Sequence, residues 1–219
     1  AAIAALTWFY MVREARAMGA NEICGAIGMQ MSGPNLQPWT IGMLLPLFLM
    51  WAEMMAAMMT PSVAPMLIAF ATINRRRRAL AAPFVSTTLF LGGYLAVWTA
   101  FSVVAAVAQW ALHSTLLLSP AMVLGSPILG GTLMIAAGVF QWTPLKYACL
   151  THCRSPLSFL MTGWREGRWG AFLMGVRHGG YCTGCCWFLM ALLFVAGVMN
   201  IGWIAAISLF VLLEKVVPS

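Results

Sequence analysis

Three cysteines lie within five residues near the C-terminal end of the chain, where a long apolar run begins: Cys182, Cys185 and Cys186. On a helix they would share one face, because offsets of three and four residues return to the same side. Thiols are soft donors that hold copper(I), zinc or iron-sulfur clusters, and neighbouring thiols can also form a redox-active set. Cysteine is also a small, readily buried residue that could serve as a packing surface. The spacing predicts a metal or thiol site and leaves a purely structural role open.

A second pair of cysteines, Cys149 and Cys153, lies four residues apart with His152 between them. We expect this pair at the end of one helix and the first three cysteines at the start of the next. If these helix ends meet, four or five thiols and an imidazole converge at one membrane face. Such a set would satisfy tetrahedral zinc or two- to four-coordinate copper(I). The remaining cysteine, Cys24, is expected in an external loop.

The segment 50–62 contains five methionines and one carboxylate, Glu53. An ionisable group deep in a membrane span is costly, so Glu53 is expected to face the bundle interior or a water-filled cavity. On an ideal helix Glu53 shares its face with small residues, while the methionines spread over the other side. Buried methionine is usually core, yet thioethers are also neutral, soft copper(I) ligands. The candidate ligands of this segment are Glu53, Met54, Met55, Met58 and Met59.

Composition defines the elements that must position these donors. The hydrophobic fraction is 62%, the charged fraction is 8% and the mean hydropathy is +0.89, which is typical of an integral membrane protein. We expect an all-α fold, a polytopic membrane helix bundle of about six transmembrane helices forming a single domain over 1–219. Segment 1–12 is too short to span alone, so the first helix is expected to be incomplete. The other expected spans are 38–73, 83–110, 120–142, 179–199 and 202–217.

The basic residues predict the orientation of this bundle. Ten of the twelve lie in the run 75–78, in the stretch 146–177 and at Lys215, which fall on one side of the membrane under this count of spans. By the positive-inside rule this side and both termini are cytoplasmic. Four consecutive arginines between two spans serve as a topology signal and can contact anionic lipid head groups. The net charge of +7 therefore indicates membrane lipids as partners, and no nucleic acid.

Four motifs together resemble a bacterial family of unknown function described as predicted metal-binding integral membrane proteins. They are the segments 50–62, 144–156, 180–187 and 198–218, so the resemblance covers nearly the whole chain. It implies a helical fold in a bacterial inner membrane and a bound metal, for which the donor types favour copper or zinc, but it implies no activity. The ligand positions that it implies are Met54, Met55, Met58, Met59, Cys149, Cys153, Cys182, Cys185 and Cys186.

Three functions follow as hypotheses. The first is metal handling or delivery, for which copper(I) is favoured because both thioether and thiolate donors are present. The second is a non-catalytic accessory subunit of a larger membrane complex with other membrane protein subunits as partners. The third is a membrane thiol oxidoreductase that uses the C-x-x-C pair. Hydrolase chemistry is disfavoured, because the chain has five acidic residues and neither a nucleophile elbow nor an H-E-x-x-H pattern. We expect no enzymatic activity.

For three other polar residues the sequence predicts roles at the surface or at the membrane interface. His113 and His178 are expected to be surface or interfacial histidines. Lys215 is expected to extend to the cytoplasmic interface and to pair with its neighbour Glu214.

Overall fold

The computed structural model describes residues 8–9, 12–13, 41–80, 84–115, 124–198 and 200–217. Its regular elements over these residues are all helices, which confirms the expected all-α class. The expected first helix, apart from the few residues named, and Cys24 lie outside the described residues. The elements are η1 (Ile41–Met43), α2 (Leu44–Ala79), α3 (Thr87–Ser114), α4 (Pro127–Phe140), α5 (Pro144–Arg154), α6 (Pro156–Gly163), α7 (Gly167–Ala191), α8 (Leu193–Ala196) and α9 (Ile201–Val216).

The described residues contain three helical segments long and apolar enough to cross a membrane: Ile41–Ala79, Thr87–Ser114 and Gly167–Ala196. A fourth crossing results if α4 and α5, which meet at a bend of 62°, count as one broken span. The expected number of six is therefore not reached in this part of the chain. Helix α9 has 16 residues, which at about 1.5 Å per residue is shorter than the roughly 30 Å apolar core of a bilayer.

Two helices extend beyond their expected bounds. Helix α7 begins at Gly167 rather than at 179, and α2 continues through the arginines at 75–78 rather than ending at 73. Arg77, near the end of α2, forms an ion pair of 2.7 Å with Glu166, which directly precedes α7. As a result, the three cysteines at 182, 185 and 186 lie well inside α7 and not in its first turn.

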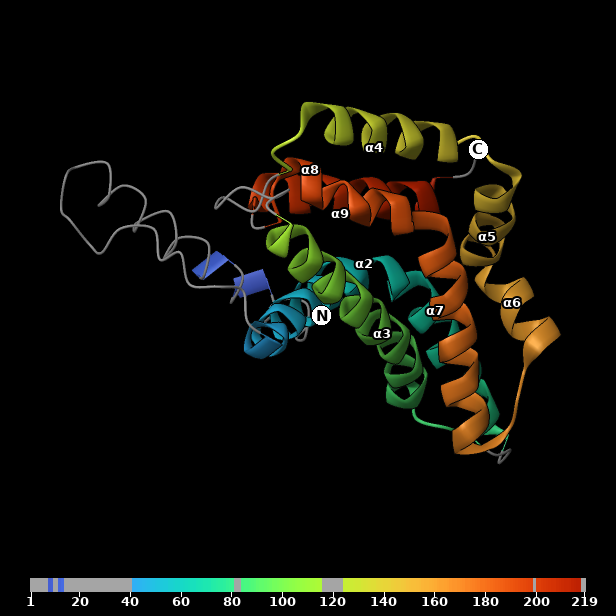
Figure 1. The fold of residues 1–219 in the computed structure, drawn as a ribbon. Helices are drawn as coiled ribbons and strands as arrows, with labels where there is room; N and C mark the ends of the chain where they lie inside the picture. The colour runs from blue at the N-terminus through green and yellow to red at the C-terminus, as the bar shows by residue number, and fades with distance from the viewer. Residues whose placement is uncertain are drawn as a thin grey trace.

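Helices α3 and α7 are in backbone contact through glycine. A methyl group on Gly175 would lie 2.0 Å from the carbonyl oxygen of Phe90, and one on Gly93 would lie 2.1 Å from that of Phe172. Small residues at a crossing allow membrane helices to approach this closely. Figure 1 shows α7 running past α3 on one side and α5 on the other. The side chains of α3 and α5 therefore reach the cysteine-bearing face of α7.

The chain reverses direction between α8 and α9. Gly197 has a φ of 94°, a left-handed conformation that favours glycine, and Asn200 caps α9 by accepting from the Trp203 amide at 3.3 Å. Helix α9 then packs on α2, where the Ser208 hydroxyl donates to the Met58 carbonyl at 3.1 Å. This return brings the last turn of α9 to the middle of α2.

Candidate functional site

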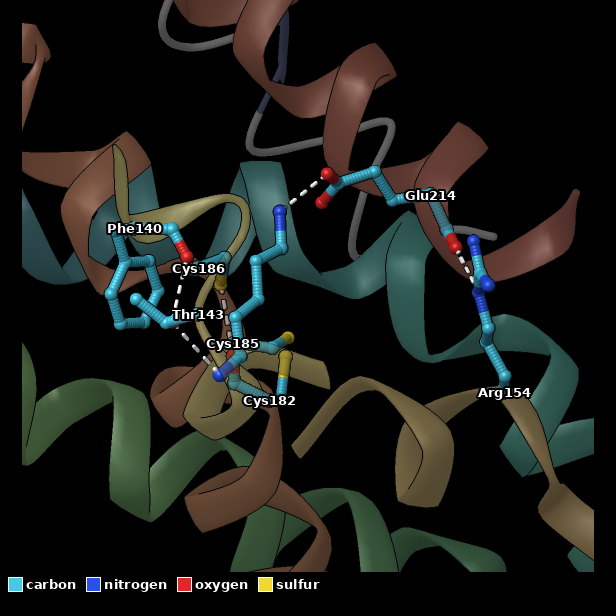
Figure 2. A network of polar contacts seen from close by, with 8 residues as sticks. Phe140, Thr143, Arg154, Cys182, Cys185, Cys186 and Glu214 are labelled. Atoms are coloured by element: carbon cyan, nitrogen blue, oxygen red, sulfur yellow. Dashed lines mark hydrogen bonds and ion pairs between the residues drawn. The ribbon is translucent and has the colours of Figure 1, made fainter. Parts of the chain in front are cut away.

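The three cysteines of α7 form a buried group of neighbouring thiols. Cys182, Cys185 and Cys186 are each at most 1% exposed. The thiols of Cys185 and Cys186 donate to the carbonyl of Cys182 at 3.1 and 2.9 Å, as Figure 2 shows. The thiols also interact with one another through their side chains. The helical spacing therefore brings the three sulfur atoms together, as the sequence predicts.

Helix α5 adds two more thiols to this group. Cys153 is 6% exposed and its thiol interacts with that of Cys185. Cys149 lies at the edge of the group, where a methyl group on Gly184 would come within 2.8 Å of its sulfur. All five are free thiols. The two cysteine segments meet in the structure, and we call these five residues the thiol cluster.

The imidazole beside the thiol cluster is not the one that the sequence indicates. His152 is exposed, and its ring stacks on Tyr181 with 4.2 Å between centroids. His178, expected to be interfacial, is instead 1% exposed and interacts electrostatically with Cys185. His113 is also buried, at 6% exposure. His178 is buried because Gly175 and Gly179, on either side of it, allow α7 to pack closely against α3.

Lys215 is the functional residue that the sequence analysis misplaces most clearly. Its side chain is buried, and its ammonium group donates to the sulfur of Cys182 at 2.8 Å and to the hydroxyl of Ser62 at 3.0 Å. It does not extend to an interface, because α9 folds back over α2. A buried ammonium ion is costly unless it is paired with negative charge. Cys182 is therefore the group on which Lys215 stabilises such charge.

Two hydroxyl groups complete the surroundings of Cys182. The phenol oxygen of Tyr94 lies 3.1 Å from the Cys182 sulfur and 3.4 Å from the Ser62 hydroxyl, and it donates to the Met59 carbonyl at 3.2 Å. Tyr94 is fully buried. Nothing in the spacing of α3 indicates Tyr94, whereas Ser62 closes the methionine motif and could have been proposed from it. Lys215, Tyr94, Ser62 and Cys182 form what we call the Lys215 cluster.

The methionine segment reaches this site with one end. Met58 and Met59 lie within one turn of Ser62, and the thioether of Met59 is 3.8 Å from the Ser62 hydroxyl. Both are fully buried, as is Met55, and Met54 is 2% exposed. Glu53 is half-buried and lies nine residues before Ser62, which is roughly 13 Å along the helix axis. The structure thus links Met59 to the surroundings of Cys182 through Ser62 and Tyr94, and leaves Glu53 at a distance.

Glu214 has a different partner from the expected Lys215. Its carboxylate forms an ion pair with Lys146 of α5, and its carbonyl accepts from the Arg154 guanidinium at 2.5 Å (Figure 2). Lys146 is 3% exposed and follows the Thr143 cap that starts α5. This second network ties α5 to α9 directly beside the thiol cluster.

The thiol cluster is compact but is not a preformed cage. Among the described residues, no group of three or more histidine, cysteine, aspartate and glutamate side chains is arranged so that it could hold a metal ion. Two of the thiols instead point at the Cys182 carbonyl. Rotation about the Cα–Cβ bonds of these cysteines would free their sulfur atoms as ligands, and the neighbouring thioethers add neutral soft donors.

These features define a class: an all-helical protein with membrane-spanning helices and a buried group of soft donors. The copper chaperone family PpoB2 matches residues 48–219, and the chain belongs to this family. The family points to copper among the metals that the sequence left open, and gives no support to zinc. No curated protein and no solved structure matches the chain. A role in copper handling therefore follows from the family.

Proposed function

We propose that this protein binds copper(I) inside the membrane through the thiol cluster and delivers it to a copper-requiring partner. The observation that carries the proposal is the convergence of Cys153, Cys182, Cys185 and Cys186 from two helices at one buried point. Copper(I) prefers thiolate and thioether ligands and accepts low coordination numbers, so two or three of these sulfur atoms suffice. Met59 is a candidate thioether ligand, because its sulfur lies 3.8 Å from the Ser62 hydroxyl that contacts Lys215.

The charges around the cluster support a monovalent soft cation as cargo. Copper(I) bound by two thiolates has a net charge of −1, and the ammonium group of Lys215 lies 2.8 Å from one of these sulfur atoms. The sum is neutral, which is the favourable state for a site buried away from water. A divalent ion on the same two thiolates beside Lys215 would leave a positive charge unbalanced.

The surface supports lipids as surroundings of the protein. Apolar side chains of α4 are widely exposed, with Ile128 at 81% and Ile135 at 71%. Membrane lipid or another membrane subunit would cover such a face. We also propose that the protein lies in a bacterial inner membrane with both termini in the cytoplasm.

The test is the copper content of the full chain, purified in mild detergent and loaded with copper(I) under anaerobic conditions. We expect about one copper per chain in the wild type, with sulfur in its first coordination shell by X-ray absorption. Simultaneous replacement of Cys182, Cys185 and Cys186 by serine removes the ligands, so the copper content falls below a tenth of the wild-type value.

The matched control is Met161→Leu, which removes one sulfur atom from an exposed side chain of α6 outside the thiol cluster and should leave the copper content unchanged. Wild-type protein that holds no copper, or a triple variant that holds as much as the wild type, contradicts the proposal. Copper-free protein that purifies with other subunits in a fixed ratio would instead support the accessory role.

A further inference from the structure

A cavity of about 210 Å³ lies next to the thiol cluster, between α2, the junction of α5 with α6, α7 and α9. Its lining includes Cys153 and His178 on the inner side and Val216, which is 56% exposed, at the outer side. The cavity therefore connects the surface near the end of α9 with the buried sulfur atoms. Cys153 belongs both to the wall of the cavity and to the thiol cluster.

His178 is the unusual group in this cavity. Its side chain is 1% exposed, and its Nδ1 atom has no hydrogen-bond partner among the described residues. The aromatic rings of Phe90, Tyr94 and Phe159 lie around it, with centroids 6.0, 5.8 and 5.5 Å away. An unsatisfied buried polar atom is costly, so its presence indicates a partner that the described residues do not supply. Imidazole nitrogen is a ligand for copper.

Soft donors line a path through the cavity. Met66 of α2 is 2% exposed and offers a thioether on the wall opposite α7. His178 precedes Cys182 by one helical turn, and the thiol of Cys153 contacts that of Cys185. A copper ion that reaches His178 is therefore one ligand exchange from the resident thiols.

We propose that His178 is the transfer ligand through which copper(I) passes between this cavity and the thiol cluster, an inference that rests on the proposed copper-binding function. The cavity is lined by the cations Lys215 and Arg154, which disfavour a free copper cation and attract an anion. The cargo therefore arrives as an anionic copper(I) complex of two small-molecule thiolates.

The transfer proceeds by three ligand exchanges. In the first, the bond from copper to one carrier sulfur breaks while a bond to Nδ1 of the neutral His178 imidazole forms, and that carrier thiolate leaves. In the second, copper binds the sulfur of Cys153 and loses the other carrier sulfur. The thiol proton of Cys153 passes to a released carrier thiolate. In the third exchange, copper binds the sulfur of Cys185 and its bond to His178 breaks, while the thiol proton of Cys185 passes to the other released carrier thiolate. Copper stays in the +1 state, so no oxidant or reductant takes part.

The test measures the rate and the extent of copper uptake by the full chain in detergent, with the copper(I) complex of glutathione as donor. For His178→Gln we expect an uptake rate at least tenfold lower than that of the wild type, with the final copper content unchanged at about one per chain. His152→Gln is the matched control, because His152 is exposed and stacks on Tyr181 outside the cavity, and its uptake rate should equal that of the wild type.

A second variant tests the path without touching a donor. Val216→Trp narrows the outer side of the cavity and should also slow uptake without lowering the final copper content. Wild-type rates in both variants overturn the inference while the copper-binding function stands. A final copper content that falls with His178→Gln also overturns it, because His178 would then be a resident ligand. A wild type that binds no copper refutes the proposed function itself.

Discussion

Two buried lysines near the end of α9, Lys146 of α5 and Lys215 of α9 itself, differ in the charge of their partners. Lys146 forms an ion pair with the carboxylate of Glu214, so that pair is complete within the chain. Lys215, the next residue after Glu214, contacts a thiol and a hydroxyl instead. The two ammonium groups are 3% and 8% exposed by residue, so burial does not separate them.

We interpret the Lys146–Glu214 pair as structural and Lys215 as part of the proposed copper site. Neighbouring residues on a helix do not face each other, so Glu214 contacts Lys146 while Lys215 contacts the thiol of Cys182 and the hydroxyl of Ser62. The charge of Lys215 is offset when sulfur becomes negative, and thiols become thiolates when they bind a metal. If the thiol cluster binds copper(I) as proposed, the Lys215 cluster becomes neutral on binding, whereas the Lys146–Glu214 pair is neutral without copper.

The largest expected effect comes from Lys215→Met, which removes the charge and keeps much of the side-chain volume. The copper(I) bis-thiolate then lacks its counter-charge, and an uncompensated buried charge costs about 3–5 kcal/mol. We expect copper(I) affinity to fall at least 100-fold, measured by competition with a chromophoric copper(I) chelator.

The conservative change Lys215→Arg keeps the charge and should restore most of this affinity. Because a buried cation can be replaced by an apolar side chain with little loss of stability, the thermal unfolding midpoint of Lys215→Met should stay near that of the wild type. Wild-type affinity in Lys215→Met would show that the cation has no part in holding copper.

The complementary change is Glu214→Gln, which should act on stability and not on copper. It leaves Lys146 buried without an anion, at a cost of about 3 kcal/mol, so the thermal unfolding midpoint should fall by several degrees. Copper content measured below that midpoint should equal that of the wild type. The double variant Lys146→Met/Glu214→Gln should recover stability. If the folded Glu214→Gln variant loses copper, the Lys146–Glu214 pair also takes part in copper binding and the contrast between the two lysines is wrong.

Local pattern was sufficient to predict the helical class and the thiol cluster. Both depend on short-range periodicity: offsets of three and four residues define a helix face, and α5 and α7 are near neighbours in the chain. The spans were predicted less well, because polar residues such as Arg177 and His178 were taken as a loop. In the folded chain Gly175 and Gly179 pack against α3 and carry these residues into the helix.

The Lys215 cluster could not be predicted, because its members come from four helices. Ser62 and Lys215 are 153 positions apart in the chain, and Tyr94 and Cys182 are 88 apart. Their meeting depends on the turn at Gly197 and on the glycine crossing of α3 with α7, neither of which leaves a periodic signal at Lys215. A lysine near a helix end therefore has the same sequence pattern whether it extends to an interface or folds inward.

The smallest expected effect is that of Tyr94→Phe, which removes one hydroxyl group beside Cys182 and keeps the ring. A hydrogen bond of this kind contributes about 1 kcal/mol, so we expect copper(I) affinity to fall about fivefold by the same chelator competition. The control is Tyr147→Phe, on an exposed phenol of α5, which should leave the affinity unchanged. An affinity loss as large as that of Lys215→Met would show that the phenol of Tyr94 stabilises the bound thiolate as much as the ammonium ion of Lys215 does. Equal affinity in Tyr94→Phe and the wild type would leave Lys215 as the polar side chain that distinguishes Cys182 from its neighbouring thiols.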